Sequence, residues 1–384
     1  MIKRQAFKYE LEPNGKQVKI CLQTAGCCRF VFNKALVLQK ENHEIGNKFI
    51  SYAEMAKKIT NWRREKDLYW LKEAPYHALQ HALKALDKSY KNFFEGRTKY
   101  PRFKKRGCGD KFHFPDKAQI KLDQGNDRIF LPKLGWIHYR NSREVIGEVR
   151  NATVSCIGNK WFISIQTEYE IEKPVPKAKS AIGIDVGVVR FATMNDGSFI
   201  EPLNSFQKHQ KRLVKYQKQL SKKVKFSKNW IKAKAKVQKI HTRIANVRKG
   251  FLHKITTAIS KNHALVCIED LKVKTMSKSS TGTIEKPGNQ VKKKSLLNKR
   301  ILDQGWSEFR RQLEYKMEWN GGLLQVVPPQ HTSTECPLCK SISSDNRKTQ
   351  AVFKCINCEY ENHADIVGAI NILERGYRLL ACGE

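Results

Sequence analysis

Two short cysteine motifs, CPLC and CINC, lie 15 residues apart near the carboxyl end of the chain. They contain Cys336, Cys339, Cys355 and Cys358. The gap falls within the roughly 15–20 residues that separate the two pairs in four-thiolate zinc sites, where each short turn presents two thiolates on one side. The alternative is two separate redox C-x-x-C pairs. We predict a structural zinc ribbon.

One detail departs from the usual zinc knuckle. Glycine commonly follows the second cysteine of each pair, because a positive φ helps the turn to close. Lys340 and Glu359 occupy those positions here. The other cysteines are scattered, and in an intracellular protein we expect them to stay reduced. They are Cys21, Cys27, Cys28, Cys108, Cys156, Cys267 and Cys382.

The charge of the chain predicts a polyanionic partner. Its 384 residues include 73 Lys or Arg against 36 Asp or Glu, a formal net charge of +37. A net charge of this size is unusual for a metabolic enzyme. The polyanion that most commonly neutralises such a charge is nucleic acid. A membrane surface is the rival, but no apolar stretch of about 18 residues occurs, and the opening MIKRQAFKYELEP lacks the apolar run of a signal peptide. We expect a soluble, intracellular protein.

Hydrophobic periodicity divides the chain in two at the proline-containing segment Glu172–Lys179. Before it, the pattern predicts strands, then helices, then strands again, which suggests a β-barrel interrupted by a helical insertion. The expected elements are strands at 7–11, 18–22, 129–131, 136–139, 148–157 and 161–167, and helices at 30–40 and 51–94. After it we expect strands at 181–185, 263–271 and 323–327, and helices at 203–262, 296–319 and 364–380.

The helical stretch at 203–262 is strongly basic. Within 201–250 there are 16 Lys or Arg residues and a single acid, Glu201. A solvated helix face normally mixes both signs of charge. We therefore interpret this segment as a helical hairpin that faces phosphates.

Three acids are placed where strands end or a helix begins. Asp185 ends the strand AIGID, Glu269 lies at the end of ALVCIED, and Asp365 opens the last helix. If these elements belong to one sheet, the three carboxylates can meet, and clustered carboxylates need cations such as Mg²⁺ or Mn²⁺. Two such ions can support phosphodiester hydrolysis. The alternatives are a turn residue for Asp185 and a helix cap for Asp365.

Several strings resemble those of one family, in the same order. They are CRFVFNKAL, LQHALKALDKSYKNFFEGR, YPRFKKRG, GIDVG, IEDL, TSTECPLCKSISSDNRKTQAVFKCINC and NHADIVGAINIL. Over nearly its whole length the chain is similar to TnpB, the OrfB-type protein of bacterial insertion sequences and a relative of type V CRISPR effector nucleases. In many members the last motif reads DxNAA, whereas here it is DIVGA at 365–369.

The resemblance implies an α+β multidomain fold. A wedge-type β-barrel with a helical recognition insert would precede a RuvC-like (ribonuclease-H-like) α/β nuclease domain with an inserted zinc ribbon. The implied segments are 1–45 and 108–172 for the barrel, 46–107 for the insert, 180–330 and 362–380 for the nuclease domain with its hairpin at about 203–262, and 331–361 for the ribbon.

The resemblance also implies an RNA-guided DNA endonuclease. One protein would bind one guide RNA from the transposon end and cut double-stranded DNA beside a short flanking motif, in the bacterial cytoplasm at the nucleoid. The RuvC-like triad maps onto Asp185, Glu269 and Asp365 with two catalytic Mg²⁺ ions, and the zinc ligands map onto the four cysteines. In this scheme guide pairing reads most of the target sequence.

Further residues are candidates for nucleic-acid contacts. Lys104, Lys105 and Arg106 would follow the phosphate backbone. Tyr52 and Gln80 would read the flanking motif, although Tyr52 is also a candidate for the core. Arg347 would neutralise the scissile phosphate, or it is a plain surface arginine.

Two other functions fit parts of the sequence. An RNA-guided repressor would use the same scaffold without cutting, but members of that kind have lost triad residues and this chain retains all three. A transposase of the tyrosine type would need a His-hydrophobe-His metal pair beside a nucleophilic tyrosine, and His77 and His81 lack that setting.

Overall fold

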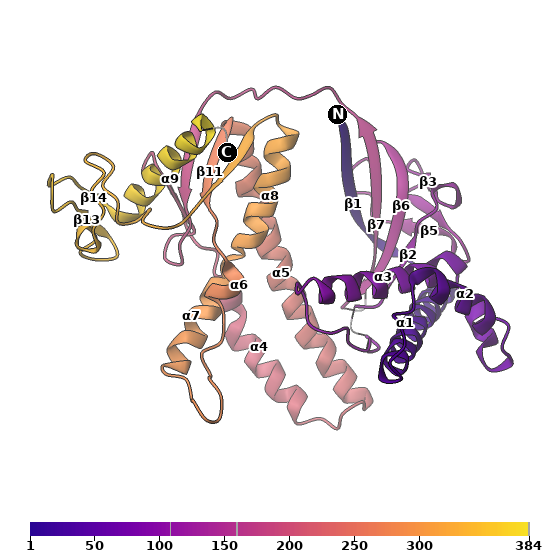
Figure 1. The fold of residues 1–384 in the computed structure, drawn as a ribbon. Coiled ribbons are helices and arrows are strands. Elements are labelled where there is room, and N and C mark those ends of the chain that lie inside the picture. Colours follow the sequence, from indigo (N-terminus) through magenta and orange to yellow (C-terminus); the bar gives the residue numbers. More distant parts are fainter. Residues whose placement is uncertain (108, 159, 383–384) are drawn as a thin grey trace. The chain divides into compact units, whose positions relative to one another are not determined.

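The structure is a computed structural model that describes residues 1–107, 109–158 and 160–382. Cys108, which we expected to be reduced, lies outside the described residues. The chain divides into two compact units, Met1–Ile171 and Glu172–Glu384. The joining segment 171–180 has neither helix nor strand. Figure 1 shows the elements of both units.

A seven-stranded antiparallel sheet forms the base of the amino-terminal unit, in the order β2-β6-β7-β1-β5-β4-β3. The longest pairing joins β1 to β7, from Ile2 opposite Glu170 to Leu11 opposite Trp161. Its strands are β1 (Ile2–Glu12), β2 (Lys111–Phe114), β3 (Lys121–Asp123), β4 (Arg128–Leu131), β5 (Gly135–Tyr139), β6 (Glu148–Ile157) and β7 (Lys160–Glu170). The expected strands at 129–131, 136–139, 148–157 and 161–167 are confirmed. Closure into a barrel stays a prediction.

Most helices of this unit lie between β1 and β2. They are α1 (Gly15–Glu44), α2 (Tyr52–Trp62), the 3₁₀ helix η1 (Lys66–Glu73) and α3 (Tyr76–Phe94), with a short 3₁₀ turn η2 (Lys117–Gln119) after β2. The strand predicted over 18–22 is wrong, because these residues belong to α1. Asn14 and Gln17 form a reciprocal capping box that starts the helix. Cys21, Ala25 and Cys28 then recur on one buried face.

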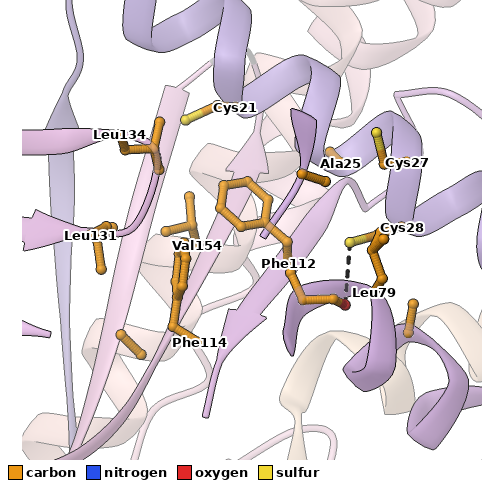
Figure 2. Close-up of a cluster of buried hydrophobic side chains, with 14 of the residues drawn as sticks. Cys21, Ala25, Cys27, Cys28, Leu79, Phe112, Phe114, Leu131, Leu134 and Val154 are labelled. Atoms are coloured by element: carbon orange, nitrogen blue, oxygen red, sulfur yellow. Dashed lines mark hydrogen bonds between the residues drawn. The ribbon is translucent and has the colours of Figure 1, made fainter. Parts of the chain in front are cut away.

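Thiols contribute to the core of this unit as apolar groups (Figure 2). Cys21 and Cys28 project from α1 toward side chains of the sheet and of α3, whereas Cys27 lies on the side of α1 that faces Trp70 and Glu73 of η1. The Cys28 thiol donates a hydrogen bond to the Ala78 carbonyl at 3.4 Å. Burial raises the pKa of Cys28 to about 12, so this thiol stays protonated at neutral pH. These cysteines therefore pack rather than react.

A mixed five-stranded sheet of order β10-β9-β8-β11-β12 forms the centre of the second unit. β8 (Ala181–Asp185), β11 (Leu265–Glu269) and β12 (Leu323–Val327) are parallel, whereas β9 (Ala192–Met194) and β10 (Phe199–Ile200) are antiparallel. The helices are α4 (Ser205–Ser221), α5 (Lys228–Asn262), α6 (Val273–Met276), α7 (Val291–Gln304), α8 (Trp306–Trp319) and α9 (Ala364–Ala381). The ribbon contains η3 (Ser344–Asn346), β13 (Val352–Lys354) and β14 (Glu361–His363).

Helices cover both faces of this sheet. Ile184 and Ile268 belong to a buried cluster with residues of α5 and α8, such as Leu313. α9 lies on the opposite face and approaches β8 very closely, because a Cβ built on Gly183 would lie 2.2 Å from the Ala369 carbonyl oxygen. Glycine at 183 thus lets the last helix dock on the sheet.

Two helical predictions need adjustment. The single helix expected at 296–319 is divided by Gly305, whose φ of +78° ends α7 and starts α8. The helical hairpin expected at 203–262 is confirmed as α4 and α5, which share a small core of Leu213, Val237, Ile240 and Ile244. A membrane-crossing helix, which needs both length and apolar composition, does not occur among the described helices.

Candidate active site and metal centre

The four predicted zinc cysteines form one cluster. Their sulfur atoms all lie within 4.8 Å of one another, with Cys336 and Cys358 3.5 Å apart and Cys339 and Cys355 also 3.5 Å apart. A tetrahedral zinc with Zn–S bonds near 2.3 Å separates its sulfurs by roughly 3.8 Å, so the spacing matches. The cysteines are not in disulfide bonds. The donor set fits a structural zinc ion.

Both zinc knuckles use a left-handed residue that is not glycine. Lys340 has a φ of +62° and Glu359 a φ of +58°. Their amides donate to the carbonyls of Cys336 and Cys355, which closes the two turns. Lys340 is also held by an ion pair with Glu374 of α9. The turns expected from the spacing therefore form despite the missing glycines.

Replacing Glu359 with glycine should tighten zinc binding. A side chain in the left-handed region costs about 1 kcal/mol, and glycine removes this cost from the folded ribbon. We expect the zinc dissociation constant to fall about fivefold, measured by competition with a chromophoric chelator. Glu359→Ala keeps the Cβ and removes the charge, so it should leave the constant unchanged. An equal change in both variants would show that the backbone conformation is not the cause.

The pleat of the sheet explains why the predicted acids approach one another. Asp185 ends β8 and Glu269 ends β11, two neighbouring parallel strands. Side chains alternate between faces, so Asp185 shares a face with Gly183, and Glu269 shares one with Cys267. That face is covered by α9, since a Cβ on Gly376 would lie 2.2 Å from the Cys267 sulfur.

Asp365 comes to the same place from the first turn of α9. Gly368 follows it by about one helical turn, and a Cβ on Gly368 would lie 3.1 Å from Oδ2 of Asp185. The helix cap is His363, whose ring nitrogen accepts from the amide of Asp365, so the interpretation of Asp365 as a mere cap is wrong. The acids do not form as tight a group as the cysteines, which are the one such group within 4.8 Å among the described residues.

The electrostatics of the acids reflect this convergence. Burial and the charges of Glu269 and Asp365 raise the pKa of Asp185 to about 7. Burial also raises the pKa of Glu269, although a hydrogen bond from Thr332 and nearby arginines oppose the shift. Ionised carboxylates are therefore costly here without a counter-charge. Such a donor set of clustered oxygens suits a hard divalent cation.

Arg347 of the ribbon forms an ion pair with one of these acids. Its Nη2 lies 3.5 Å from Oδ1 of Asp365, and it donates to the Gln350 carbonyl at 3.1 Å. The pKa values of Asp185 and Glu269 are raised overall, and the positive charge of Arg347 opposes this rise. Arg347 is half-buried beside the acids, which does not match the interpretation as a plain surface arginine.

A polar network that sequence reasoning missed holds Glu269. Thr332 is 3% exposed, and its hydroxyl lies 2.5 Å from Oε1 of Glu269. Asn371 of α9 donates to the carbonyls of Thr332 and Glu335, and Arg375 donates to the carbonyls of Pro328 and Gln330 and to the Glu335 carboxylate. The sequence did contain a sign of this network, because Asn371 and Arg375 are four residues apart and therefore lie on one face of α9.

The predicted contacts of the amino-terminal unit differ in accessibility. Tyr52 is half-buried and packs against the core, and Gln80 lies on α3 with its Oε1 3.2 Å from His77 Nδ1. Lys105 and Arg106 are exposed. Lys104 is turned inward, because Asn33 bonds both its amide and its carbonyl and its Nζ lies 3.7 Å from the Phe32 ring centre. Burial lowers the pKa of Lys104 to about 8.

Family profiles match three parts of the chain. The OrfB profile of the IS605 type, described as "Probable transposase", covers 164–280, and a "Cas12f1-like, TNB domain" profile covers 306–372. A "Helix-turn-helix domain" profile of the same OrfB group covers 1–48. In this structure residues 1–48 contain β1 and the single long helix α1.

The chain is also similar to named proteins over its whole length. It is 54% identical to "Putative RNA-guided DNA endonuclease InsQ" of Escherichia coli K12, covering 100% of this chain and 95% of that protein. It is 30% identical to a "Putative RNA-guided DNA endonuclease" of Streptomyces pristinaespiralis, covering 99% and 91%. This chain, with the fold and the acid and cysteine clusters described above, is therefore a protein of the OrfB type. The chain belongs to the OrfB family of IS605-type elements, the family of TnpB.

The fold is related to that of a solved effector nuclease. The cryo-EM structure of a Cas12f1–sgRNA–target DNA complex matches with a TM-score of 0.53 at 15% identity, covering 93% of this chain and 82% of that one. At this identity the match supports the fold alone. It agrees with an α+β architecture that has a mixed sheet and a ribbon-like TNB domain.

Proposed function

We propose that this protein is an RNA-guided DNA endonuclease that cuts DNA by metal-dependent phosphodiester hydrolysis. The observation that carries the proposal is the convergence of Asp185, Glu269 and Asp365, which are 84 and 96 residues apart in sequence. The names of its relatives and the net charge of +37 support the same conclusion.

In this proposal the three carboxylates hold Mg²⁺, or Mn²⁺ in its place. When bound, two such ions supply the positive charge that activates a water and stabilises the leaving oxygen. Asp185, whose pKa is raised by the charges of both other acids, would hold the metal together with Glu269 and Asp365. Arg347 would balance the acids before metal binding and contact the scissile phosphate afterwards. Zinc on the four cysteines would keep the ribbon folded.

Both units would take part in binding the nucleic acids. We assign the first unit to the wedge-type barrel with its helical recognition insert, and the second to a RuvC-like nuclease domain with an inserted ribbon. Lys105 and Arg106 would follow the backbone of a guide RNA or heteroduplex, whereas Lys104 would position their loop. Tyr52 and Gln80 remain candidates for reading the flanking motif. One protein per RNA, acting in the bacterial cytoplasm, is the arrangement we propose.

The test is cleavage by the purified protein with its own RNA. The RNA that copurifies with the chain would be sequenced, and a double-stranded DNA carrying the matching sequence beside randomised flanks would be incubated with the complex and Mg²⁺. We expect Mg²⁺-dependent double-strand breaks only in DNA that matches the RNA. Binding without cleavage across metals and temperatures would favour a repressor. Movement of a transposon end without a helper enzyme would favour a transposase.

Thr332 provides a separate test of the acid site. Its hydroxyl donates to Glu269 or to the Pro329 carbonyl, 3.1 Å away, and the first bond fixes the Glu269 carboxylate. Thr332→Val removes the hydroxyl at similar volume. We expect a rise of about tenfold in the Mg²⁺ concentration needed for half-maximal cleavage, with a similar shift in direct Mn²⁺ binding.

Two variants control for simple misfolding. Thr332→Ser keeps the hydroxyl and should behave almost as the wild type. Thr334→Val alters a partly buried threonine in the same turn, whose hydroxyl approaches only His331 at 3.5 Å, and should not change the metal requirement. If Thr332→Val lowers cleavage equally at every Mg²⁺ concentration, the hydroxyl does not position a metal ligand.

A further inference from the structure

The loop between α4 and α5 exposes an unusual apolar tip. The loop spans residues 222–227, between the end of α4 at Ser221 and the start of α5 at Lys228. Val224 is 80% exposed and Phe226 is 73% exposed. Trp230, in the first turn of α5, lies beside Phe226 with ring centres 5.5 Å apart. A group of exposed apolar side chains rimmed by polar residues is a candidate binding surface.

The backbone holds Phe226 in an unfavourable conformation. Its φ of +71° is in the left-handed region, which is unfavourable for a bulky side chain. The next residue, Ser227, caps α5 by accepting from the Trp230 amide at 3.1 Å. The chain therefore turns sharply into α5 with the phenylalanine on the outside. Such strain is more common at binding sites than in passive loops.

The charged residues around the aromatic pair are all basic. Lys225 Nζ lies 5.4 Å from the Phe226 ring centre, and Lys234 Nζ lies 5.2 Å from the Trp230 ring centre. No acid occurs between residues 202 and 250. Among the described residues, no ion pair is recorded for the exposed lysines of the tip. These are Lys222, Lys223, Lys225, Lys228 and Lys232.

The tip stands on a hairpin with a core of its own. Leu213 of α4 packs with Val237, Ile240 and Ile244 of α5. Farther along, Leu252 and Ile259 anchor α5 in the core under the sheet. The hairpin joins the tip to the unit that carries the acids (Figure 1). The aromatic pair thus lies at the end of a packed helical hairpin rather than on a long flexible loop.

We propose that the tip is a base-stacking site, in which Phe226, supported by Trp230, stacks on an unpaired base of a single-stranded nucleic acid while the lysines contact its phosphates. Aromatic rings beside cations are the usual means of binding single strands, because every base offers a π-face. A single strand is the appropriate ligand, since base faces inside a duplex are already stacked. The proposal rests on the nucleic-acid binding of the proposed function, but not on cleavage.

The test separates base stacking from phosphate attraction. The full chain would be titrated with a fluorescent 12-nucleotide thymidine oligomer and with an abasic oligomer of equal length. We expect Phe226→Ala to weaken binding of the thymidine oligomer about five- to tenfold and to leave the abasic oligomer unchanged. Lys225→Ala should weaken binding of both oligomers and reduce the salt dependence. Photocrosslinking with 5-iodouracil should label the peptide containing Phe226 and Trp230.

Matched variants distinguish a stacking ring from a merely apolar side chain. Phe226→Trp keeps a ring and should restore binding, whereas Val224→Ala removes exposed apolar surface without a ring and should have no effect. Equal weakening of both oligomers by Phe226→Ala, unchanged binding of both, or no crosslink at the tip would overturn the proposal. Asp185→Asn should keep the stacking signal, so a failure of the nuclease proposal alone would leave this result intact.

Discussion

Replacing Asp185 with asparagine is expected to abolish DNA cleavage while leaving nucleic-acid binding at the wild-type level. Asparagine has nearly the same shape, but it lacks the charge that holds the proposed metal ions. We expect a loss on the order of a thousandfold or more, because residues that act as one unit fail together. Cleavage of matched DNA and binding by mobility shift would be measured on the same preparation.

The Asp185→Asn variant should also fold. Burial and the neighbouring acids raise the pKa of Asp185 to about 7, so its ionised form is unfavourable in the metal-free protein and the neutral amide removes that cost. Asp196→Asn is the matched control, because Asp196 is exposed in a turn of the same unit and accepts hydrogen bonds from the amide and hydroxyl of Ser198. Cleavage by Asp185→Asn at a rate near that of the wild type would refute the assignment of the acids.

Removing zinc is expected to abolish cleavage as completely as the loss of an acid. A structural zinc contributes about 10–16 kcal/mol of apparent binding free energy, so the ribbon should unfold locally without it. Two residues of the segment 331–361 contact the acids. Arg347 forms an ion pair with Asp365, and Thr332 donates a hydrogen bond to Glu269. We therefore expect Cys336→Ser to stop cleavage and to increase hydrogen exchange across 331–361, while β8 and β11 stay protected.

Controls for this experiment are available in the same chain. Zinc added back to chelator-treated protein should restore cleavage. Cys382→Ser changes an exposed cysteine outside the ribbon and should have no effect. Native mass spectrometry should find one zinc per chain. Protein that contains no zinc, or that cuts DNA normally after chelation, would show that the ribbon is held by other means.

The sequence predicted those features that depend on local pattern. The spacing of the four cysteines was sufficient, because two short turns can present their thiolates to one ion. Asp185 and Glu269 were recognisable because each ends a short apolar run, and parallel strands end at one edge of a sheet. Asp365 was added from its place at the start of the last helix, whereas the assignment of the three acids to a RuvC-like triad came from family resemblance and still awaits the experiments above.

Other features depend on contacts that a linear pattern does not contain. The run at 18–22 alternates as a strand would, yet the capping box at Asn14 and the buried face of α1 determine a helix. Gly305 divides a continuous helical pattern only because its backbone adopts a positive φ. Lys104 looked like any other basic residue, and its inward position depends on Asn33, 71 residues away.

The position of α9 in the chain has a consequence for synthesis. Asp365 follows the ribbon and lies 19 residues before the end of the printed sequence. A ribosome therefore completes the basic hairpin long before it adds the third acid, so under the proposed function a nascent chain can bind RNA before it is able to cut DNA. A premature stop codon within the ribbon would remove Asp365 and keep that hairpin, so we expect its product to bind RNA without cutting DNA.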